Sequence, residues 1–335
     1  MKMRVHQPVF DRVIKKCCDL DPIAVAVVSP LSEVALRGAI EAARAGLINP
    51  YLVGPRAKIA AVAREHGVEI APYLIVDVAD DFEAAERGVE LCRVGTCEAL
   101  MNGSLHPDHF LQPTMAEDTG LRLKRRMSHA FVVDTPNYSR TLIITDAAIN
   151  VYPKLEEKAD IVQNAIDLAH VLGIATPKVA ILSTIETVSS NIPSTIDAAA
   201  LCKMADRGQI TGGVLDGPLA FDDATEPEAA QIKQIDSAVA GQADILLVPD
   251  LESGNMLVKQ LQSLAGVEAA GIVLGARVPI ILTSRAANPQ TRLASTAIAA
   301  LLAQKDRQEL SAVSAGFGVL LQSKTWLSSN GSDLR

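Results

Sequence analysis

A serine and an arginine stand side by side directly after an apolar, β-branched run near the end of the chain. Residues 278–282 have the pattern of a buried strand, and Thr283, Ser284 and Arg285 follow them. In an open α/β sheet, ligands bind in the crevice beyond the carboxyl ends of the strands. A hydroxyl beside a guanidinium can hold a phosphate there, because both groups donate hydrogen bonds and arginine adds positive charge. Ser284 and Arg285 are therefore candidates for an anion site.

Five further polar clusters also follow apolar, strand-like runs. They are Asn102-Gly103-Ser104, Thr145-Asp146, Ser183-Thr184, Asp216-Gly217-Pro218 and Asp250, and Gly254 and Asn255 come shortly after the last. Any single cluster is more simply explained by turn chemistry, because Asp, Asn, Ser and Gly are common where strands end. If the strands are parallel, however, all six ends lie at one edge of the sheet. The pattern then predicts a cleft along that edge.

The elements that would carry these clusters alternate between strand and helix patterns. Strands are predicted at residues 23–28, 51–53, 99–101, 179–182, 243–248 and 278–282, and helices at 32–46, 55–67, 83–94, 155–172, 195–206 and 292–304. Residues 130–133 and 141–145 are joined by a short polar link that contains Pro136, which predicts a hairpin. The alternation predicts an α/β fold with a mostly parallel sheet, and we expect the last helix to pack back on the first domain.

The composition limits the classes of partner. The 335 residues carry 31 Lys and Arg against 39 Asp and Glu, a net charge of −8, which argues against a nucleic-acid-binding protein. Apolar runs are too short for a membrane span, and the first ten residues lack the apolar core of a signal peptide. The five cysteines have no zinc-site spacing and suggest reduced core thiols. We expect a cytoplasmic protein that binds neither nucleic acid nor membrane.

Several nucleotide and hydrolase motifs are missing from the sequence. It contains no P-loop, no glycine-rich dinucleotide motif after the first strand and no nucleophile elbow. The acidic residues Asp222, Asp223, Glu226 and Glu228 suit a helix N-terminus better than a metal site, and we predict no metal. His129 follows Arg126 and Ser128 and precedes a strand. It could line the cleft, or it could be a structural histidine.

Six short segments together resemble one known family. They are LMNG at 100–103, RMSHAF at 126–131, TDAAIN at 145–150, DGPLA at 216–220, PDLESGN at 249–255 and TSRA at 283–286. In this order they are similar to the phosphate acetyl/butyryltransferase (phosphotransacetylase) family, over about residues 98–303. The segments TDAAIN and DGPLA look closer to the butyryl branch and to the acyltransferase half of fusions with an enoyl-CoA hydratase domain.

The resemblance implies a fold and a reaction. The fold would be two α/β/α domains around a cleft, as in isocitrate and isopropylmalate dehydrogenases, with residues 1–145 and 288–335 in the first domain and 146–287 in the second. The reaction would be acyl-CoA plus phosphate giving acyl-phosphate plus coenzyme A. Coenzyme A would be a co-substrate, no cofactor would be bound permanently, and the protein would form homodimers or larger assemblies.

The resemblance also implies roles for individual residues. In direct attack of the CoA thiolate on the acyl carbonyl, Ser284 would donate to the carbonyl or the phosphate, and Arg285 would bind phosphate or the CoA pyrophosphate. Asp146 and His129 are the candidate proton acceptors. Backbone amides around Gly103 and Gly254 could add further donors. The remaining candidates would bind substrate, and they are Asn102, Gly103, Ser128, Asp216, Gly217, Gly254 and Asn255.

Two positions depart from the acetyl branch of the family. That branch has an acidic residue a few positions after its Ser-Arg pair, whereas residues 286–291 contain no carboxylate and include Asn288 and Thr291. It also has an arginine for phosphate where this chain offers Gln112. Two alternatives therefore stay open. One is a protein that binds CoA or acyl-phosphate without catalysis, and the other is a metal- and NAD-dependent dehydrogenase on the same fold.

Overall fold

The computed structural model describes residues 8–284 and 287–329, with side chains placed up to Ser311. Eleven strands in the described residues form one mixed sheet. In spatial order they are β3 (Leu74–Asp77), β2 (Ile48–Gly54), β1 (Ile23–Val28), β4 (Ala99–Asn102), β11 (Ile280–Ile281), β10 (Glu268–Leu274), β5 (Ser128–Asp134), β6 (Leu142–Thr145), β9 (Ile245–Leu247), β7 (Lys178–Leu182) and β8 (Val214–Leu219).

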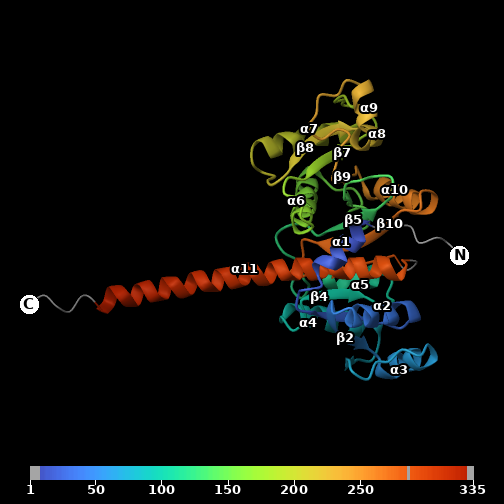
Figure 1. The fold of residues 1–335 in the computed structure, drawn as a ribbon, viewed down its shortest axis with the longest axis vertical. Helices are drawn as coiled ribbons and strands as arrows, with labels where there is room; N and C mark the ends of the chain where they lie inside the picture. Colours follow the sequence, from blue (N-terminus) through green and yellow to red (C-terminus); the bar gives the residue numbers. More distant parts are fainter. Residues whose placement is uncertain (1–7, 285–286, 330–335) are drawn as a thin grey trace, which may run out of the picture.

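Helices cover the sheet on both faces. They are α1 (Pro8–Lys16), α2 (Glu33–Arg44), α3 (Arg56–Glu65), α4 (Asp81–Arg93), α5 (Pro107–Thr114), α6 (Leu155–Val171), α7 (Pro193–Asp206), α8 (Phe221–Thr225), α9 (Pro227–Ile232), α10 (Leu251–Leu264) and α11 (Pro289–Ser329). In Figure 1, α2 to α5 surround one half of the sheet and α6 to α10 the other. Helix α11 crosses between the two halves and continues well beyond the body.

The strands of the two halves run in opposite directions. β3, β2, β1, β4 and β11 are parallel to one another, and β10 is antiparallel to both β11 and β5. β6 is antiparallel to β5, and β9, β7 and β8 run parallel to β6. The expectation that all six polar clusters end at one edge of the sheet is therefore wrong. β4 and β11 end at one edge, and β6, β7, β8 and β9 end at the other.

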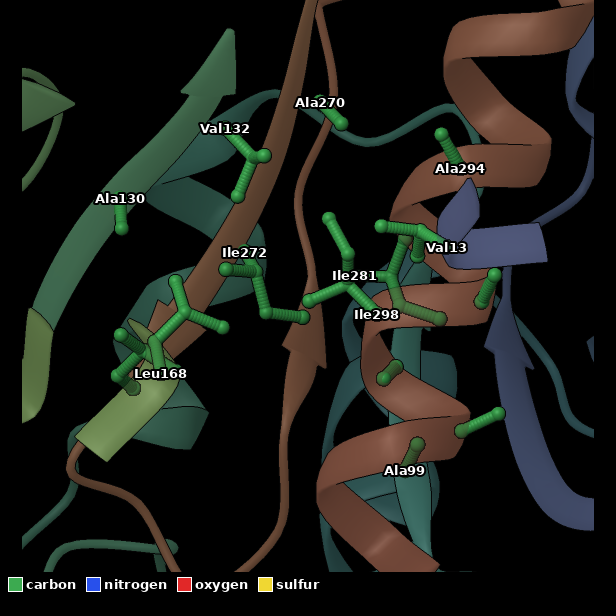
Figure 2. Close-up of a cluster of buried hydrophobic side chains, with 14 of the residues drawn as sticks. Val13, Ala99, Ala130, Val132, Leu168, Ala270, Ile272, Ile281, Ala294 and Ile298 are labelled. Carbon is green, nitrogen blue, oxygen red and sulfur yellow. The ribbon is translucent and has the colours of Figure 1, made fainter. Parts of the chain in front are cut away.

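A shared core joins the two halves. Figure 2 shows Val13 of α1 and Ile298 of α11 packing toward Ile281 of β11 and Ile272 of β10. These last three side chains are at most 3% exposed, and each buried side chain of this size stabilises the fold by roughly 1.5–3 kcal/mol. The small residues on the inner face of α11, including Ala294, allow the helix to lie close to the sheet. Helix α11 therefore packs against both β10 and β11.

A charged contact holds α11 on the β1–β4 side. The Arg307 guanidinium donates to both carboxylate oxygens of Glu98, with an Nη2–Oε2 distance of 2.7 Å, and the Ala24 amide donates to the same carboxylate. Burial by itself would raise the pKa of Glu98, but these hydrogen bonds outweigh it and the pKa is lowered. Glu98 therefore stays ionised and keeps the helix in register with the sheet.

Most predicted elements are confirmed, and the differences have local causes. The hairpin is β5 and β6, and Ser32 caps α2 by accepting from the Ala35 amide at 3.3 Å. The sequence prediction missed β3 and β10, and α11 continues far past the predicted end at residue 304. Asp216 and Gly217 do not follow a strand, because both lie inside β8, where the register with β7 shifts. The predicted domain boundaries stay a prediction.

The cysteines are all free thiols. Cys17, Cys92 and Cys97 are buried, Cys202 is partly buried and Cys18 is exposed. Burial raises the pKa of Cys17 to about 11 and of Cys202 to about 12, so both are protonated near neutral pH. This agrees with the prediction of core thiols for every cysteine except Cys18.

Candidate functional site

Hydroxyl groups gather where β1, β4 and β11 end. The Leu31 amide donates to Ser104 Oγ at 3.1 Å, and Ser104 Oγ donates to Ser32 Oγ at 3.0 Å, next to the first turn of α2. Ser29, which follows β1, donates through its Oγ to Asp81, the first residue of α4, at 2.8 Å. The N-terminus of a helix favours anions, because its first amides have no helical acceptors. We call this edge the polar rim: Ser29, Ser32, Asn102, Gly103, Ser104 and Ser284.

Gly103 shapes the rim through its lack of a side chain. A Cβ atom here would lie 2.4 Å from the Val28 carbonyl oxygen and 2.7 Å from that of Ser29. The Gly103 amide donates to Val28 at 2.9 Å, and the Gly254 amide donates to the Asp250 carbonyl within α10 at 3.1 Å. These two amides therefore already have backbone acceptors, and the role of other backbone amides around them stays a prediction.

Asn102 has a structural partner of its own. Its side chain accepts from the Leu105 amide at 3.2 Å and donates to the Leu105 carbonyl at 3.0 Å. These bonds close the turn after β4 and hold Gly103 and Ser104 in place. Together with Thr283 and Arg292, Asn102 also lines a narrow pocket of about 10 Å³, which has room for one water-sized group.

Ser284 lies in a loop that Arg292 holds. The Ser284 carbonyl accepts from the Ala287 amide at 2.9 Å and from Arg292 Nη2 at 3.3 Å. Arg292 Nε donates to the Ala287 carbonyl at 3.3 Å, so one guanidinium ties both ends of the loop. Burial lowers the pKa of Arg292, but a guanidinium stays charged in proteins. Arg285, the predicted phosphate ligand, lies outside the described residues.

Asp146 is enclosed by donors at the opposite edge of the sheet. Its side chain is 2% exposed and accepts from the His129 amide at 3.1 Å, from Asn150 Nδ2 at 2.6 Å and from the amides of Ala148 and Ile149 at 2.9 and 3.0 Å. These four bonds use the acceptor sites of a carboxylate. Asp146 therefore anchors the loop after β6, and this geometry does not favour it as a proton acceptor.

His129 is equally enclosed, with 1% of its surface exposed. Its Nε2 donates to the Leu282 carbonyl at 3.2 Å, and its ring packs edge-on against Phe131. Nδ1 is buried without a hydrogen-bond partner in the part of the chain that the structure describes. Burial lowers the pKa of His129, and the nearby Asp146 carboxylate and the Leu282 carbonyl offset this only in part. The ring is therefore neutral near pH 7.

The buried histidine makes stability depend on pH. Below about pH 6.5 the unfolded chain takes up a proton that the folded chain excludes, so the free energy of unfolding falls as the pH drops, by at most about 1.4 kcal/mol per pH unit. Urea unfolding at pH 7.5 and pH 5.5 measures this loss. The loss should be smaller in His129→Gln and unchanged in the exposed control His109→Gln. An equal loss in both variants would contradict the assignment.

The predicted catalytic residues do not meet at one point. Asp146 follows β6, whose Thr145 is opposite Ala130, and His129 is opposite Val273. Ile280 is opposite the same Val273 in β11. Ser284 lies four positions beyond Ile280, which is about 13 Å along an extended chain. His129 is linked to the chain that leads to Ser284 through the Leu282 carbonyl, and the catalytic roles of the three residues stay predictions.

The remaining candidate substrate-binding residues lie in two parts of the structure. Ser128 is buried and accepts from Asn164 Nδ2 at 2.9 Å, and Asn255 donates to the Ala147 carbonyl at 3.2 Å. Gly254 packs under the same loop, since a Cβ there would lie 3.1 Å from the Asp146 carbonyl oxygen. Gly254 and Asn255 therefore contact the Asp146 loop, and Ser128 lies at the same edge of the sheet, bound to Asn164 of α6. Asp216 and Gly217 lie on β8, the outermost strand of the other half, away from both groups.

Two cavities open beside the polar rim. Gln112 lines one of about 680 Å³, with Arg87 and Arg93, and one of about 400 Å³, with Lys58 and His109. Asp81 also lines the smaller cavity, and its bond to Ser29 links that cavity to the rim. Both volumes suit a small-molecule site. Ser29 and Ser32 of the rim, and Arg292 beside the Ser284 loop, were not predicted as site residues from the sequence, although a serine that caps α2 is a usable signal.

Within residues 8–284 and 287–329, no group of three or more His, Cys, Asp or Glu side chains is arranged to hold a metal ion. No helix in this part of the chain is both long and apolar enough to cross a membrane.

Comparison with known proteins shows the family of this chain. The family model described as "Phosphate acetyl/butaryl transferase" matches residues 81–300. A phosphate acetyltransferase of Rhizobium meliloti is 58% identical over 89% of this chain and 94% of its own length. A phosphate butyryltransferase of Clostridium acetobutylicum is 40% identical over 88% of this chain and 98% of its own. Of these two relatives, the one named an acetyltransferase therefore shares more identity.

Solved structures agree with the sequence relatives. A phosphotransacetylase from Streptococcus pyogenes superposes with a TM-score of 0.75 at 25% identity, over 91% of this chain and all of its own. At the level of fold alone, a 4-hydroxythreonine-4-phosphate dehydrogenase from Klebsiella pneumoniae superposes with a TM-score of 0.52 at 14% identity. The predicted dehydrogenase-like α/β fold is confirmed. The chain belongs to the phosphate acetyl/butaryl transferase family.

Proposed function

We propose that this protein transfers a short acyl group between phosphate and coenzyme A. The observation that carries the proposal is family membership over most of the chain, with relatives that are named for this reaction. The polar rim supports it, because its hydroxyls lie at the N-terminus of α2, and α2 lines a narrow pocket together with Thr283, the residue before Ser284. An anionic acyl-phosphate needs donors of this kind.

The reaction needs a proton acceptor for the CoA thiol, a hydrogen-bond donor for the carbonyl oxygen and a cation for the phosphate. The CoA sulfur must lose its proton and attack the acyl carbon, so that the C–S bond forms while the carbon–oxygen bond to phosphate breaks and phosphate leaves with the electron pair. The carbonyl oxygen gains negative charge during attack, and Ser284 would donate to it or to the phosphate. Arg285 would bind the phosphate or the CoA pyrophosphate. Holding both substrates together lowers the entropic cost of the encounter.

An acyl-phosphate panel tests the proposal directly. Purified protein is incubated with CoA and acetyl-, propionyl- or butyryl-phosphate, and thioester formation is followed by absorbance. We expect turnover with at least one member, and the ratio of kcat/KM values identifies the acyl group. No thioester with any member would contradict the proposal.

A second candidate is a protein that binds CoA or acyl-phosphate without turning it over. The missing carboxylate between Ser284 and Thr291 favours this reading. Calorimetry that detects CoA binding, together with an inactive panel, would support it. For the enzyme, we also propose a cytoplasmic location. We further propose a homodimer or larger assembly, and light scattering of the purified protein would measure its molar mass.

Arg285→Ala should weaken anion binding. Removing a bidentate cation from a phosphate site costs about 1.5–3 kcal/mol, so we expect KM for acyl-phosphate or for CoA to rise by about 10- to 100-fold. Steady-state kinetics with each substrate varied in turn shows which anion is bound. Arg277→Ala removes an exposed arginine from the loop before β11 and serves as the matched control. Unchanged KM values for both substrates would refute the role.

A further inference from the structure

A carboxylate from a different part of the chain reaches the first turn of α11, which follows the Ser284 loop. Residues 286–291 contain none, yet Thr291 Oγ1 donates to Glu268 Oε2 at 2.7 Å. Thr291 is fully buried and its amide donates to Asn288, which caps the start of α11. Glu268 is partly exposed, and its Oε1 has no hydrogen-bond partner within the described residues. The side chain is thus positioned by one contact and keeps acceptor capacity.

The antiparallel direction of β10 explains this placement. β11 ends at the edge of the sheet that carries the polar rim, and β10 begins at the same edge. A Cβ on Gly271 would lie 2.3 Å from the Leu282 carbonyl oxygen, so the two chains still run side by side past the end of β11. Glu268 is the first residue of β10 and therefore lies toward the Ser284 end of this pair.

Helix α11 ties Glu268 and Ser284 to neighbouring residues. Thr291 binds the Glu268 carboxylate, and Arg292, the next residue, donates to the Ser284 carbonyl. One helical turn therefore fixes both groups. By contrast, Asp146 has its acceptor sites filled at the other edge of the sheet, and His129 has little exposed surface.

We propose that Glu268 accepts the proton of the CoA thiol, a step that rests on the proposed function. The proton moves from sulfur to the carboxylate, the thiolate attacks the acyl carbon, and the bond from that carbon to the phosphate oxygen breaks with the electron pair on phosphate. The Thr291 hydroxyl holds the carboxylate in position. The titratable group opposite Glu268 on β5 is Asp134, and Asp11 and Arg12 of α1 lie close to Asp134.

The test compares the pH profiles of kcat for wild type and four variants. Glu268→Gln should lower kcat by about 100-fold and remove the decline of kcat at acid pH, while both KM values stay within about threefold. Glu268→Asp should keep that decline and recover part of kcat. Thr291→Val, which leaves the carboxylate in place but loosens it, should show a smaller loss of kcat than Glu268→Gln. Glu228→Gln, an exposed glutamate of α9, is the matched control and should behave as wild type.

The possible outcomes are distinct. A Glu268→Gln protein with the wild-type kcat and pH profile overturns this inference and leaves the proposed function intact. An inactive wild type across the acyl-phosphate panel overturns the proposed function, and this inference with it. A loss of kcat that accompanies a large fall in melting temperature, with the acid decline retained in the residual activity, assigns Glu268 a structural role and also overturns the inference.

Discussion

Ser284→Ala is expected to lower kcat by about 100- to 1,000-fold, the effect of removing one donor from an oxyanion site. The donor matters in the transition state, because the acyl oxygen then carries charge that the bound substrate lacks. The Ala287 amide and Arg292 Nη2 both donate to the Ser284 backbone carbonyl, and the substitution keeps these two contacts of the loop. KM should therefore change little.

Steady-state kinetics with CoA and the best acyl-phosphate measures this prediction. Ser263→Ala removes an exposed serine near the end of α10 and controls for the loss of a hydroxyl as such. If Ser284→Ala raised KM alone, the hydroxyl would bind the ground state. If kcat and KM both matched wild type, Ser284 would have no part in the reaction.

Gly103→Ala is expected to lower the free energy of unfolding by about 3 kcal/mol and to reduce kcat/KM. The added carbon would meet the Val28 and Ser29 carbonyl oxygens at 2.4 and 2.7 Å. These atoms belong to the end of β1 and cannot swing aside as a side chain could, so the strain falls on the backbone. The turn carries Ser104, whose bonds reach Ser32 and Leu31, and a shift there would disturb the polar rim.

Urea unfolding and kinetics on the same preparation measure both effects. Gly54→Ala is the matched control, because Gly54 ends the neighbouring strand β2 and an added Cβ would lie 3.4 Å from Ile59, an ordinary contact. We expect the control to stay within about 0.5 kcal/mol of wild type. Equal stability of the two variants would show that β1 and β4 can separate at this end without cost.

Local patterns predicted the elements whose residues strongly favour one structure. The β-branched run of β1, the serine cap of α2 and the polar hairpin link all carry their own signals. β10 was missed because its first half, Glu268, Ala269, Ala270 and Gly271, has low strand propensity. It forms because both of its neighbours in the sheet supply partners, and that pairing is a property of the tertiary structure.

The sequence by itself determined the family and the order of the segments that identify it. Which of these segments meet was decided by the direction of the strands. An apolar strand has the same composition whether it pairs parallel or antiparallel, because direction depends on long-range pairing and not on local preference. The reversal across β10 and β5 places Asp146 and Ser284 at opposite edges of the sheet. The same reversal brings Glu268 to the edge where Ser284 lies, a proximity that no spacing along the chain predicts.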